Sequence, residues 1–235
     1  MNNETYFTDD LHSLKKYWED KDRAIRFLDG GTRTSALQVL VKRVELDIHQ
    51  GSWLDTGTGS GFVQTLIDTT VVPTLFIGLD FSGIMLRTQQ SPYGERVMGS
   101  TFQLPFRRNS FNIVTNIFSL SDYPEIKIAF IELGRVVDTA GSLVHLDYAI
   151  GDDYWERRKQ NHNNLADDGS IIVGNINLRS LEQIKKWSPE DMRIVFQKYL
   201  ESIVKTASIS ALFELPKEIT RKFILTQFYK YRSKK

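Results

Sequence analysis

The stretch that decides the fold reads Trp53-Leu54-Asp55-Thr56-Gly57-Thr58-Gly59-Ser60-Gly61. A short apolar run and an acidic residue are followed by glycines at alternate positions. Glycine lets the backbone turn tightly and approach a ligand closely, and a helix after such a turn offers unpaired backbone N–H groups. The stretch therefore predicts a strand, a turn that binds a nucleotide-type ligand, and a helix.

Further short apolar runs follow this strand and alternate with helical stretches, at residues 74–79, 113–117 and 143–146. Because these runs are apolar on both faces, they are typical of parallel strands covered by helices on each side. A helix is predicted from Pro124 to Val137, with Gly141 after its end. Strand-helix-strand repetition predicts right-handed crossovers and an α/β, doubly wound, Rossmann-like sheet.

The two flanks of this region differ from it in pattern. Apolar residues recur at helical spacing over 9–29 and 34–49, so residues 1–50 are predicted to form an N-terminal helical cap. Residues 51–235 are predicted to form one domain. Within it, the polar stretch at about 150–188 is interpreted as a lid-like insertion, with 171–173 as its strand-like piece.

The C-terminal part begins with a helix-start signal. Ser188 is predicted to cap a helix that has Pro189 in its first turn and that extends to about Val204. The strand-like runs 208–215 and 222–231 are predicted to pair in antiparallel orientation and to end the sheet.

Composition excludes several classes of function. The formal net charge is +1, which indicates no global attraction to nucleic acid or to an anionic membrane. The chain has no cysteine, which excludes disulfides, thiolate zinc sites and a cysteine nucleophile. No targeting signal and no membrane-spanning run is recognised, so a cytoplasmic protein is expected. The acidic pairs 152–153 and 167–168 are interpreted as solvated, and no metal site is predicted.

Four motifs in this order resemble a known family. The glycine turn preceded by Asp55 is followed by Asp80 at the end of a strand, by the run from Gly99 to Phe106 with 110–114, and by 132–141. Together, over roughly residues 50 to 147, they resemble class I S-adenosylmethionine-dependent methyltransferases, a family that includes ubiquinone and menaquinone biosynthesis enzymes. The resemblance implies a mainly parallel seven-stranded sheet whose last strand is antiparallel.

The resemblance also implies a cofactor and its contacts. The cofactor would be S-adenosyl-L-methionine, with S-adenosyl-L-homocysteine as product. The glycine turn would contact its methionine part, Asp80 its ribose, Phe81 its adenine ring, and Asn116 and Ile117 its sulfonium. The implied cofactor-binding residues are Asp55, Thr56, Gly57, Thr58, Gly59, Gly61, Asp80, Phe81, Ser100, Thr101, Phe102, Asn116 and Ile117.

The chain departs from the family pattern at three places. Ser100 replaces an aspartate that often contacts the adenine amino group, and Asn112 replaces the aspartate of SFDxV. Residues 138–140 replace the lysine-proline-glycine of the loop after the helix. A member of the fold that binds the cofactor without transferring a methyl group is therefore an alternative.

The acceptor chemistry is less specified than the cofactor site. Methyl transfer from a sulfonium is an in-line displacement that needs alignment and desolvation, with a general base only for some acceptors. The weak candidates for such a group are Asp147, Tyr148 and His162, whereas His145 is interpreted as a core histidine. A small-molecule acceptor is the leading hypothesis, and an RNA methyltransferase is an alternative. No membrane partner is predicted.

Overall fold

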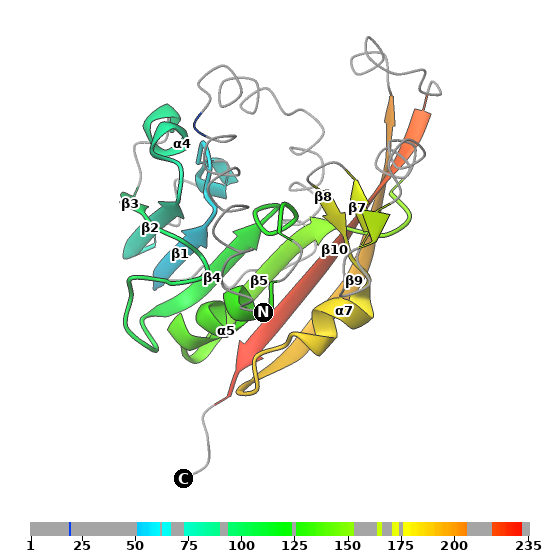
Figure 1. Cartoon of the computed structure of the whole chain (residues 1–235). Coiled ribbons are helices and arrows are strands. Elements are labelled where there is room, and N and C mark those ends of the chain that lie inside the picture. The colour runs from blue at the N-terminus through cyan, green and yellow to red at the C-terminus, as the bar shows by residue number, and fades with distance from the viewer. Residues whose placement is uncertain are drawn as a thin grey trace, which may run out of the picture.

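The sheet is the organising element of the computed structural model, which describes residue 19 and residues 51–61, 63–66, 73–89, 94–123, 126–152, 164–165, 171–173, 176–205 and 218–231. Its order is β3-β2-β1-β4-β5-β10-β9 (Figure 1). These strands are β1 (Ser52–Thr56), β2 (Leu75–Asp80), β3 (Glu95–Met98), β4 (Phe111–Ile117), β5 (Val137–Tyr148), β9 (Met192–Lys205) and β10 (Glu218–Lys230).

The strand directions confirm the predicted fold class. Strands β1 to β5 pair in parallel with one another, whereas β10 is antiparallel to both β5 and β9. The four predicted core strands are observed as β1, β2, β4 and β5. The edge strand β3 was not predicted, because its residues are mostly exposed and lack an apolar run. The carboxyl ends of the parallel strands meet at one edge, where α/β sheets bind ligands.

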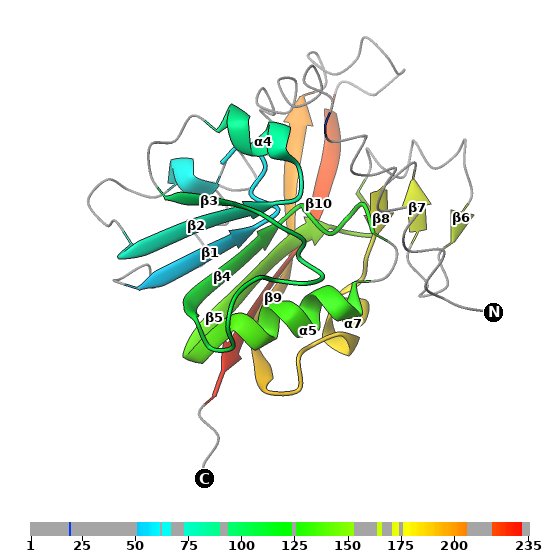
Figure 2. The same cartoon turned by 60° about the vertical axis from the view of Figure 1, so that its left-hand side comes forward.

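Helices cover both faces of the sheet. Helix α5 (Lys127–Val136) and helix α7 (Leu181–Lys186) lie on one face, and α4 (Gly83–Thr88) lies near β2 and β3 (Figures 1 and 2). Fully buried side chains of α5 and the sheet form the main core, including Leu54, Val114, Phe130, Leu133 and Phe228. The helix predicted over 124–137 is thus confirmed as α5. Gly141, predicted to follow that helix, lies inside β5 instead.

The helix predicted from Ser188 to Val204 is wrong. Met192–Lys205 is strand β9, which pairs with β10 along nearly its whole length. A serine-capped helix does occur nearby, because Ser180 caps α7 in a capping box with Gln183. Ser188, Pro189 and the acidic residues after them give a helix-start signal that depends only on neighbouring residues. The pairing of β9 with β10 depends on residues far along the chain, and it determines the structure here. Pro189 packs instead against helix α5, since a Cβ added at Gly134 would lie 2.6 Å from its side chain.

The predicted antiparallel pairing of residues 208–215 with residues 222–231 is also wrong. Strand β10 includes 222–230, but its antiparallel neighbours are β5 and β9. Residues 208–215 lie outside the described residues, as do the helices predicted over 9–29 and 34–49 apart from Glu19.

Part of the predicted insertion forms a small second sheet. Its strands are β6 (Asn164–Leu165), β7 (Ile171–Val173) and β8 (Ile176–Leu178), in the order β6-β7-β8. The strand expected at 171–173 is therefore confirmed. Figure 2 shows this sheet beyond the carboxyl end of β5. A bridge between Ala149 and Arg179 joins the two regions.

A buried lysine joins the last strand to helix α5. Lys230 is 4% exposed, and its Nζ donates hydrogen bonds to the carbonyl oxygens of Gly134 and Val137 and to Oδ1 of Asn109, at 2.9 to 3.1 Å. It also lies 3.0 Å from Oδ2 of Asp191. A cation at a helix C-terminus pairs with carbonyl groups that the helix leaves unpaired. The end of β10 is thereby fixed to the end of α5.

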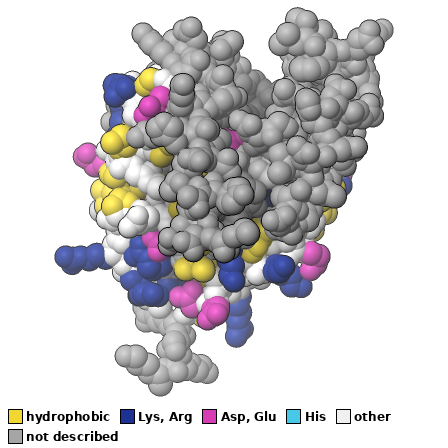
Figure 3. Space-filling model, in the orientation of Figure 1, with side chains coloured by type: hydrophobic (Ala, Val, Ile, Leu, Met, Phe, Trp, Pro, Cys, Tyr) yellow, Lys and Arg dark blue, Asp and Glu magenta, His cyan; other side chains and the backbone are white. Residues whose placement is uncertain are grey.

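The described surface carries both signs of charge. On the face seen in Figure 3, Lys and Arg side chains lie beside Asp and Glu side chains. This agrees with a formal net charge of +1. Within the described ranges, no helix has the length and apolar character needed to cross a bilayer, and no group of three or more possible metal-ligating side chains occurs.

Candidate functional site

The glycine turn lies at the carboxyl end of β1. Gly57, Gly59 and Gly61 all have positive φ, at 65°, 55° and 83°, a region that residues with a Cβ enter at a cost. Among the described residues, a Cβ added at Gly59 would meet nothing within 4 Å. The described residues after the turn form a 3-10 helix, η1 (Val63–Leu66), where the sequence predicted an α-helix start.

Asp55 lies beneath this turn and is 1% exposed. Its Oδ1 accepts a hydrogen bond of 2.7 Å from the hydroxyl of Thr115. Its Oδ2 is buried and has no hydrogen-bond partner among the residues that the structure describes. Burial raises the pKa of Asp55 to about 7, and the hydroxyls of Thr115 and Thr58 oppose that rise only in part. A cation that pairs with Oδ2 would stabilise the ionised carboxylate.

Asp80 ends β2 beside the same turn. Its Oδ2 accepts from the backbone N–H of Gly59 at 2.9 Å, and its Oδ1 accepts from that of Ser82 at 2.8 Å. Burial raises its pKa, although these hydrogen bonds favour the charged form. Each carboxylate oxygen can accept more than one hydrogen bond, so ribose hydroxyls can still be bound. Asp80 is buried and does not cap the following helix, because Ser82 is the N-cap of α4.

Glutamine side chains complete the polar lining of the turn. Gln89 donates from Nε2 to the carbonyl oxygen of Gly59 at 2.9 Å, while its Oε1 has no partner within the described part of the chain. Neither Nε2 nor Oε1 of the buried Gln64 has a hydrogen-bond partner among the described residues. Buried polar atoms are normally hydrogen-bonded in native proteins. Together with the orphaned oxygen of Asp55 and the lack of described atoms within 4 Å of a Cβ at Gly59, they fit a polar cofactor bound at the turn.

The loop after β3 brings the predicted adenine-edge residues to this edge of the sheet. Thr101 is buried, and the Ser100 hydroxyl accepts from the backbone N–H of Phe102. The ring of Phe102 meets that of Tyr123 edge-on, with centroids 4.8 Å apart. Phe81 is partly exposed directly after Asp80. The Ser100 hydroxyl thus already supports the turn of its own loop.

A pair of charged residues on α5 holds this loop. Glu132 accepts from the backbone N–H of Leu104, and Arg135 donates to the carbonyl oxygens of Leu104 and Phe106. The two side chains pair with each other at 2.7 Å, which lowers the pKa of Glu132. The glutamate and arginine of the fourth sequence motif therefore position the segment that carries Thr101 and Phe102. Sequence reasoning recognised the motif but gave these residues no role.

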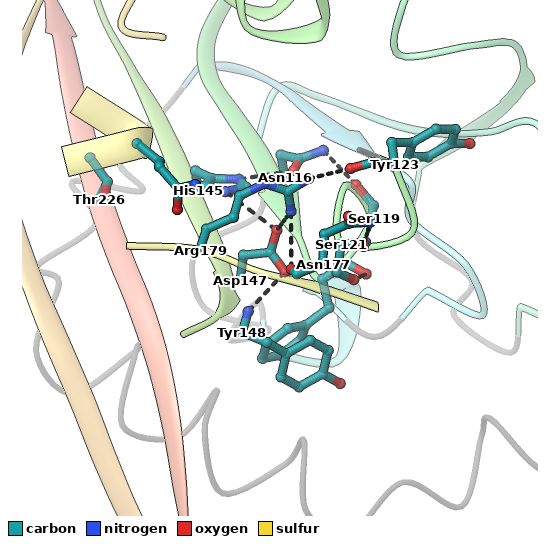
Figure 4. A network of polar contacts seen from close by, with 12 residues as sticks. Asn116, Ser119, Ser121, Tyr123, His145, Asp147, Tyr148, Asn177, Arg179 and Thr226 are labelled. Atoms are coloured by element: carbon teal, nitrogen blue, oxygen red, sulfur yellow. Dashed lines mark hydrogen bonds and ion pairs between the residues drawn. The ribbon is translucent and has the colours of Figure 1, made fainter. Parts of the chain in front are cut away.

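The side chains of Asn116 and Ile117, at the end of β4, contact different parts of the protein. Ile117 packs against the cluster of Trp53, Val63 and Phe76. Asn116 is fully buried and donates from Nδ2 to the hydroxyls of Thr56, at 2.9 Å, and Ser119, at 2.5 Å (Figure 4). Asn116 therefore connects β1 to the loop that follows β4.

His145 shares this network and is fully buried. Its Nδ1 lies 3.0 Å from Oδ1 of Asn116, and its Nε2 lies 3.8 Å from Oδ2 of Asp147. Burial and the nearby Arg179 lower the pKa of His145 to about 3, so the imidazole is neutral at physiological pH. This agrees with the interpretation of His145 as a core histidine.

Among the candidate catalytic groups, Asp147 is already paired. It is fully buried, its Oδ1 accepts from the backbone N–H of Tyr148, and its Oδ2 lies 3.1 Å from Nη1 of Arg179. Burial raises its pKa to about 6, although Arg179 favours the charged form. Tyr148 is 4% exposed. His162 lies outside the described residues.

Sequence reasoning missed Arg179 and Asn177. Arg179 is fully buried and also donates to the carbonyl oxygen of Tyr123, while Asn177 donates from its backbone and its side chain to the carbonyl oxygen of Ser121 at 2.7 and 2.8 Å (Figure 4). These contacts fix the loop after β4. A buried arginine in a polar stretch carries no local signal, because only the fold brings Asp147 to it.

The site therefore joins residues from six parts of the chain. The carboxyl ends of β1, β2, β4 and β5, the loop after β3 and the segment after β8 meet at one edge of the sheet (Figures 1 and 4). The predicted residues that the structure places there are Asp55, Thr56, Gly57, Thr58, Gly59, Gly61, Asp80, Phe81, Ser100, Thr101, Phe102, Asn116, Ile117, Asp147 and Tyr148. Of the departures from the family pattern, Asn112 lies at the opposite edge, where its Oδ1 accepts from the backbone N–H of Ser52.

Comparison with known proteins identifies this arrangement. Residues 54–145 match the family model described as "Methyltransferase domain". This segment therefore resembles a methyltransferase domain, in agreement with the resemblance to class I methyltransferases. The chain is 33% identical over 126 residues to a demethylmenaquinone methyltransferase of Roseiflexus castenholzii, which covers 52% of this chain and 51% of the relative. The comparisons support S-adenosylmethionine as the cofactor of the domain.

Solved structures show the same fold over more of the chain. A Haloferax volcanii complex between the Trm112 methyltransferase activator and a methyltransferase gives a TM-score of 0.68 at 15% identity, covering 92% of this chain and 97% of that one. A methyltransferase of Methanosarcina mazei gives a TM-score of 0.57 at 13% identity, covering 83% and 98%. The sequence match is narrower, since the chain spans about half the length of the curated relatives it matches.

Proposed function

We propose that this protein is a cytoplasmic methyltransferase that uses S-adenosylmethionine to methylate a small molecule. The observation that carries the proposal is the glycine turn over the buried Asp55, whose Oδ2 is without a partner among the described residues. The match of residues 54–145 to a methyltransferase domain supports it. The small-molecule acceptor draws support from the demethylmenaquinone methyltransferases at about 30% identity and from the mixed surface charge.

In this proposal the residues of the turn hold the methionine part of the cofactor. The ionised Asp55 accepts a hydrogen bond from the methionine ammonium group at Oδ2, and the backbone at Gly57, Gly59 and Gly61 leaves room for the chain of the ligand. Asp80 binds the ribose hydroxyls in addition to its two backbone N–H groups. Phe81, Ser100, Thr101 and Phe102 surround the adenine ring, and Glu132 with Arg135 keeps that loop in place.

When bound, S-adenosylmethionine supplies a methyl group on a positively charged sulfur. The protein's contribution is alignment and exclusion of water, because the displacement itself needs no covalent help from the chain. Asn116 and Arg179 hold the loop after β4 on two sides, and this loop borders the turn: a Cβ added at Gly57 would lie 2.1 Å from Cβ of Ser119. Asp147 is already paired with Arg179, with Oδ2 3.1 Å from Nη1. An acceptor proton can therefore be transferred to Asp147 only if that pair opens.

The test uses two glycines with the same backbone constraint. Gly59 and Gly151 both have positive φ, at 55° and 90°, and neither Cβ would approach described backbone closely. Alanine at either position therefore imposes a similar strain of about 1 kcal/mol. We expect Gly59→Ala to weaken binding of S-adenosylhomocysteine at least tenfold in isothermal titration calorimetry, while Gly151→Ala retains the wild-type affinity.

Thermal unfolding with S-adenosylmethionine, S-adenosylhomocysteine and NAD completes the test. A ligand at ~100 times its dissociation constant stabilises the folded state by about 2.7 kcal/mol. Stabilisation by the two sulfur compounds and not by NAD supports the proposal. The proposal is wrong if neither sulfur compound stabilises the protein. Binding without turnover on a broad acceptor panel would favour the non-methylating alternative, and salt-dependent binding of RNA would favour the RNA methyltransferase.

A further inference from the structure

A buried arginine connects the end of the small second sheet to the loop that follows β4. Arg179 comes directly after β8 and is fully buried. Its Nη1 lies 3.1 Å from Oδ2 of Asp147, and its Nη2 donates to the carbonyl oxygen of Tyr123 (Figure 4). Because the guanidinium is planar and carries several donors in a fixed arrangement, it can hold both partners at once. Arg179 therefore fixes the backbone of Tyr123 relative to the end of β5.

The backbone of Arg179 is held in place as well. Its N–H donates to the carbonyl oxygen of Tyr148 at 3.3 Å, and its carbonyl oxygen accepts from the N–H of Ile150 at 3.1 Å. Its guanidinium also lies over the ring of Trp187, 5.7 Å from the ring centroid. Since its backbone and its side chain are both held, Arg179 has a defined position from which to fix Tyr123.

The side chain of Tyr123 extends this constraint to the loop after β3. Tyr123 is 8% exposed, and its ring meets the ring of Phe102 edge-on, with centroids 4.8 Å apart. Burial and the charges of Asp122 and Asp80 raise the pKa of the Tyr123 hydroxyl, which therefore stays neutral. The electrostatic effect of Asp80 indicates that Tyr123 lies near the carboxylate proposed to bind the ribose. One ring thus contacts the loop on the adenine side and lies close to the ribose site.

The contact with Tyr123 supports a part of the loop that helix α5 does not bind through its charged pair. That pair binds the loop backbone at Leu104 and Phe106. Phe102 precedes both positions, and its ring is oriented by the contact with Tyr123. The loop is therefore supported at two places, directly from α5 and, through Tyr123, from Arg179.

We propose that Arg179 is a positioning residue for the adenine and ribose side of the cofactor, and that it acts through Tyr123 and Phe102. This inference rests on the proposed function and adds a residue of the predicted insertion to its cofactor site. Loss of the contact between Arg179 and Tyr123 lets the loop after β4 shift, and the loop on the adenine side shifts with it. The glycine turn keeps its own hydrogen bonds with Asp80 and Gln89, so the methionine side is held independently.

The experiment uses two ligands that separate the adenine side from the methionine side. S-adenosylhomocysteine has both parts, whereas methylthioadenosine has the adenine and the ribose but no amino-acid part. Calorimetry measures the affinity of each ligand for wild type and for Arg179→Lys, at a temperature at which both proteins are folded. Lysine retains a cation for Asp147 but lacks the planar, multiple donors that also hold Tyr123. We expect Arg179→Lys to bind both ligands about tenfold more weakly, with an unchanged ratio of the two affinities.

A second variant, Tyr123→Leu, tests the route through the ring. It removes the contact with Phe102 and should weaken the binding of both ligands by a similar factor. Combined with Arg179→Lys, it should weaken binding no further than the more affected single variant, because both changes interrupt the same set of contacts. Wild-type affinities in Tyr123→Leu overturn the inference even where Arg179→Lys does not fold.

Arg221→Lys is the matched control. Arg221 is also buried and pairs with a buried carboxylate, since its Nε lies 2.8 Å from Oδ2 of Asp152. Its guanidinium lies over the ring of Tyr148, 5.5 Å from the centroid, rather than against Tyr123. This variant should keep the wild-type affinity for both ligands. The same loss in Arg221→Lys as in Arg179→Lys would show a general effect of weakening a buried ion pair and would overturn the inference.

The remaining outcomes separate the inference from the proposed function. Wild-type affinities in Arg179→Lys, or a loss confined to S-adenosylhomocysteine, overturn the inference, while binding of S-adenosylhomocysteine by wild type leaves the proposed function in place. If wild type binds neither ligand, the proposed function fails and the inference fails with it.

Discussion

Binding of S-adenosylhomocysteine should depend on pH through Asp55. The pKa of this buried carboxyl is raised to about 7, and its partnerless Oδ2 is proposed to accept the ligand's ammonium group. With that pKa, the carboxylate is ionised in about nine tenths of molecules at pH 8 and in about one tenth at pH 6. If only the ionised form binds tightly, the affinity falls about tenfold over this range.

Isothermal titration calorimetry at pH 6, 7 and 8 measures the effect. Asp55→Asn should bind weakly at all three values and lose the dependence, since its amide does not titrate. Glu182→Gln, which removes an exposed carboxylate at the start of α7, is the control and should keep the wild-type profile. A wild-type affinity that is unchanged from pH 6 to 8, or an Asp55→Asn protein that keeps the full tenfold change, would refute the reasoning.

The carboxyl group of Asp55 should also make the folded state less stable as the pH rises. Because the folded-state pKa of Asp55 is higher than its unfolded value of 3.8, its contribution to stability is present below pH 3.8 and is lost as the pH rises through about 7. Between pH 4 and 7, the free energy of unfolding of Asp55→Asn should therefore fall less than that of wild type, and the difference should reach up to about 4 kcal/mol. Urea unfolding at several pH values without ligand measures this, and parallel pH profiles of variant and wild type would contradict it.

Three further substitutions test the packing. Ala140 has a φ of 70° where the family pattern has glycine, so Ala140→Gly should raise the free energy of urea unfolding by about 1 kcal/mol, and a decrease would contradict this. Lys230→Met leaves buried carbonyl groups unpaired and should lower that free energy by about 2 kcal/mol, whereas no change would mean that the hydrogen bonds contribute nothing. Arg179→Met should cost about 3 to 5 kcal/mol, and combining it with Asp147→Leu should cost less than the sum of the two single changes. Additive effects in that double-mutant cycle would show that the pair is not coupled.

The parallel core could be predicted because its signals are local. Strands β1, β2, β4 and β5 each carry an apolar run, and the glycines after β1 permit the positive φ angles of the turn. Strand β3 has three exposed residues among its four, so no pattern revealed it. Strand β9 was predicted as a helix because Ser188 and Pro189 give a helix-start signal, whereas the pairing that makes it a strand comes from β10.

The residues of the site also fall into two groups, those with a local sequence signal and those brought together only by the fold. Asp55 and Asp80 stand beside the motif that predicts them, so sequence spacing was enough to name them. Arg179 is separated from Asp147 by 32 positions and from Tyr123 by 56, and only the folded chain brings them together. The roles of Glu132 and Arg135 were also hidden, because their partners are backbone carbonyl and N–H groups, which are the same in every sequence.

The position of β10 has a consequence for how the protein is made. Among the described strands of the sheet it comes last in the sequence, yet it lies inside the sheet between β5 and β9. Until it emerges from the ribosome, β5 and β9 both present unpaired strand edges, and such edges recruit strands from other chains. A nascent chain that stalls before Glu218 therefore has two unpaired strand edges, and both become paired once β10 has been synthesised. Expression trials of C-terminally shortened forms should yield aggregates rather than a smaller enzyme.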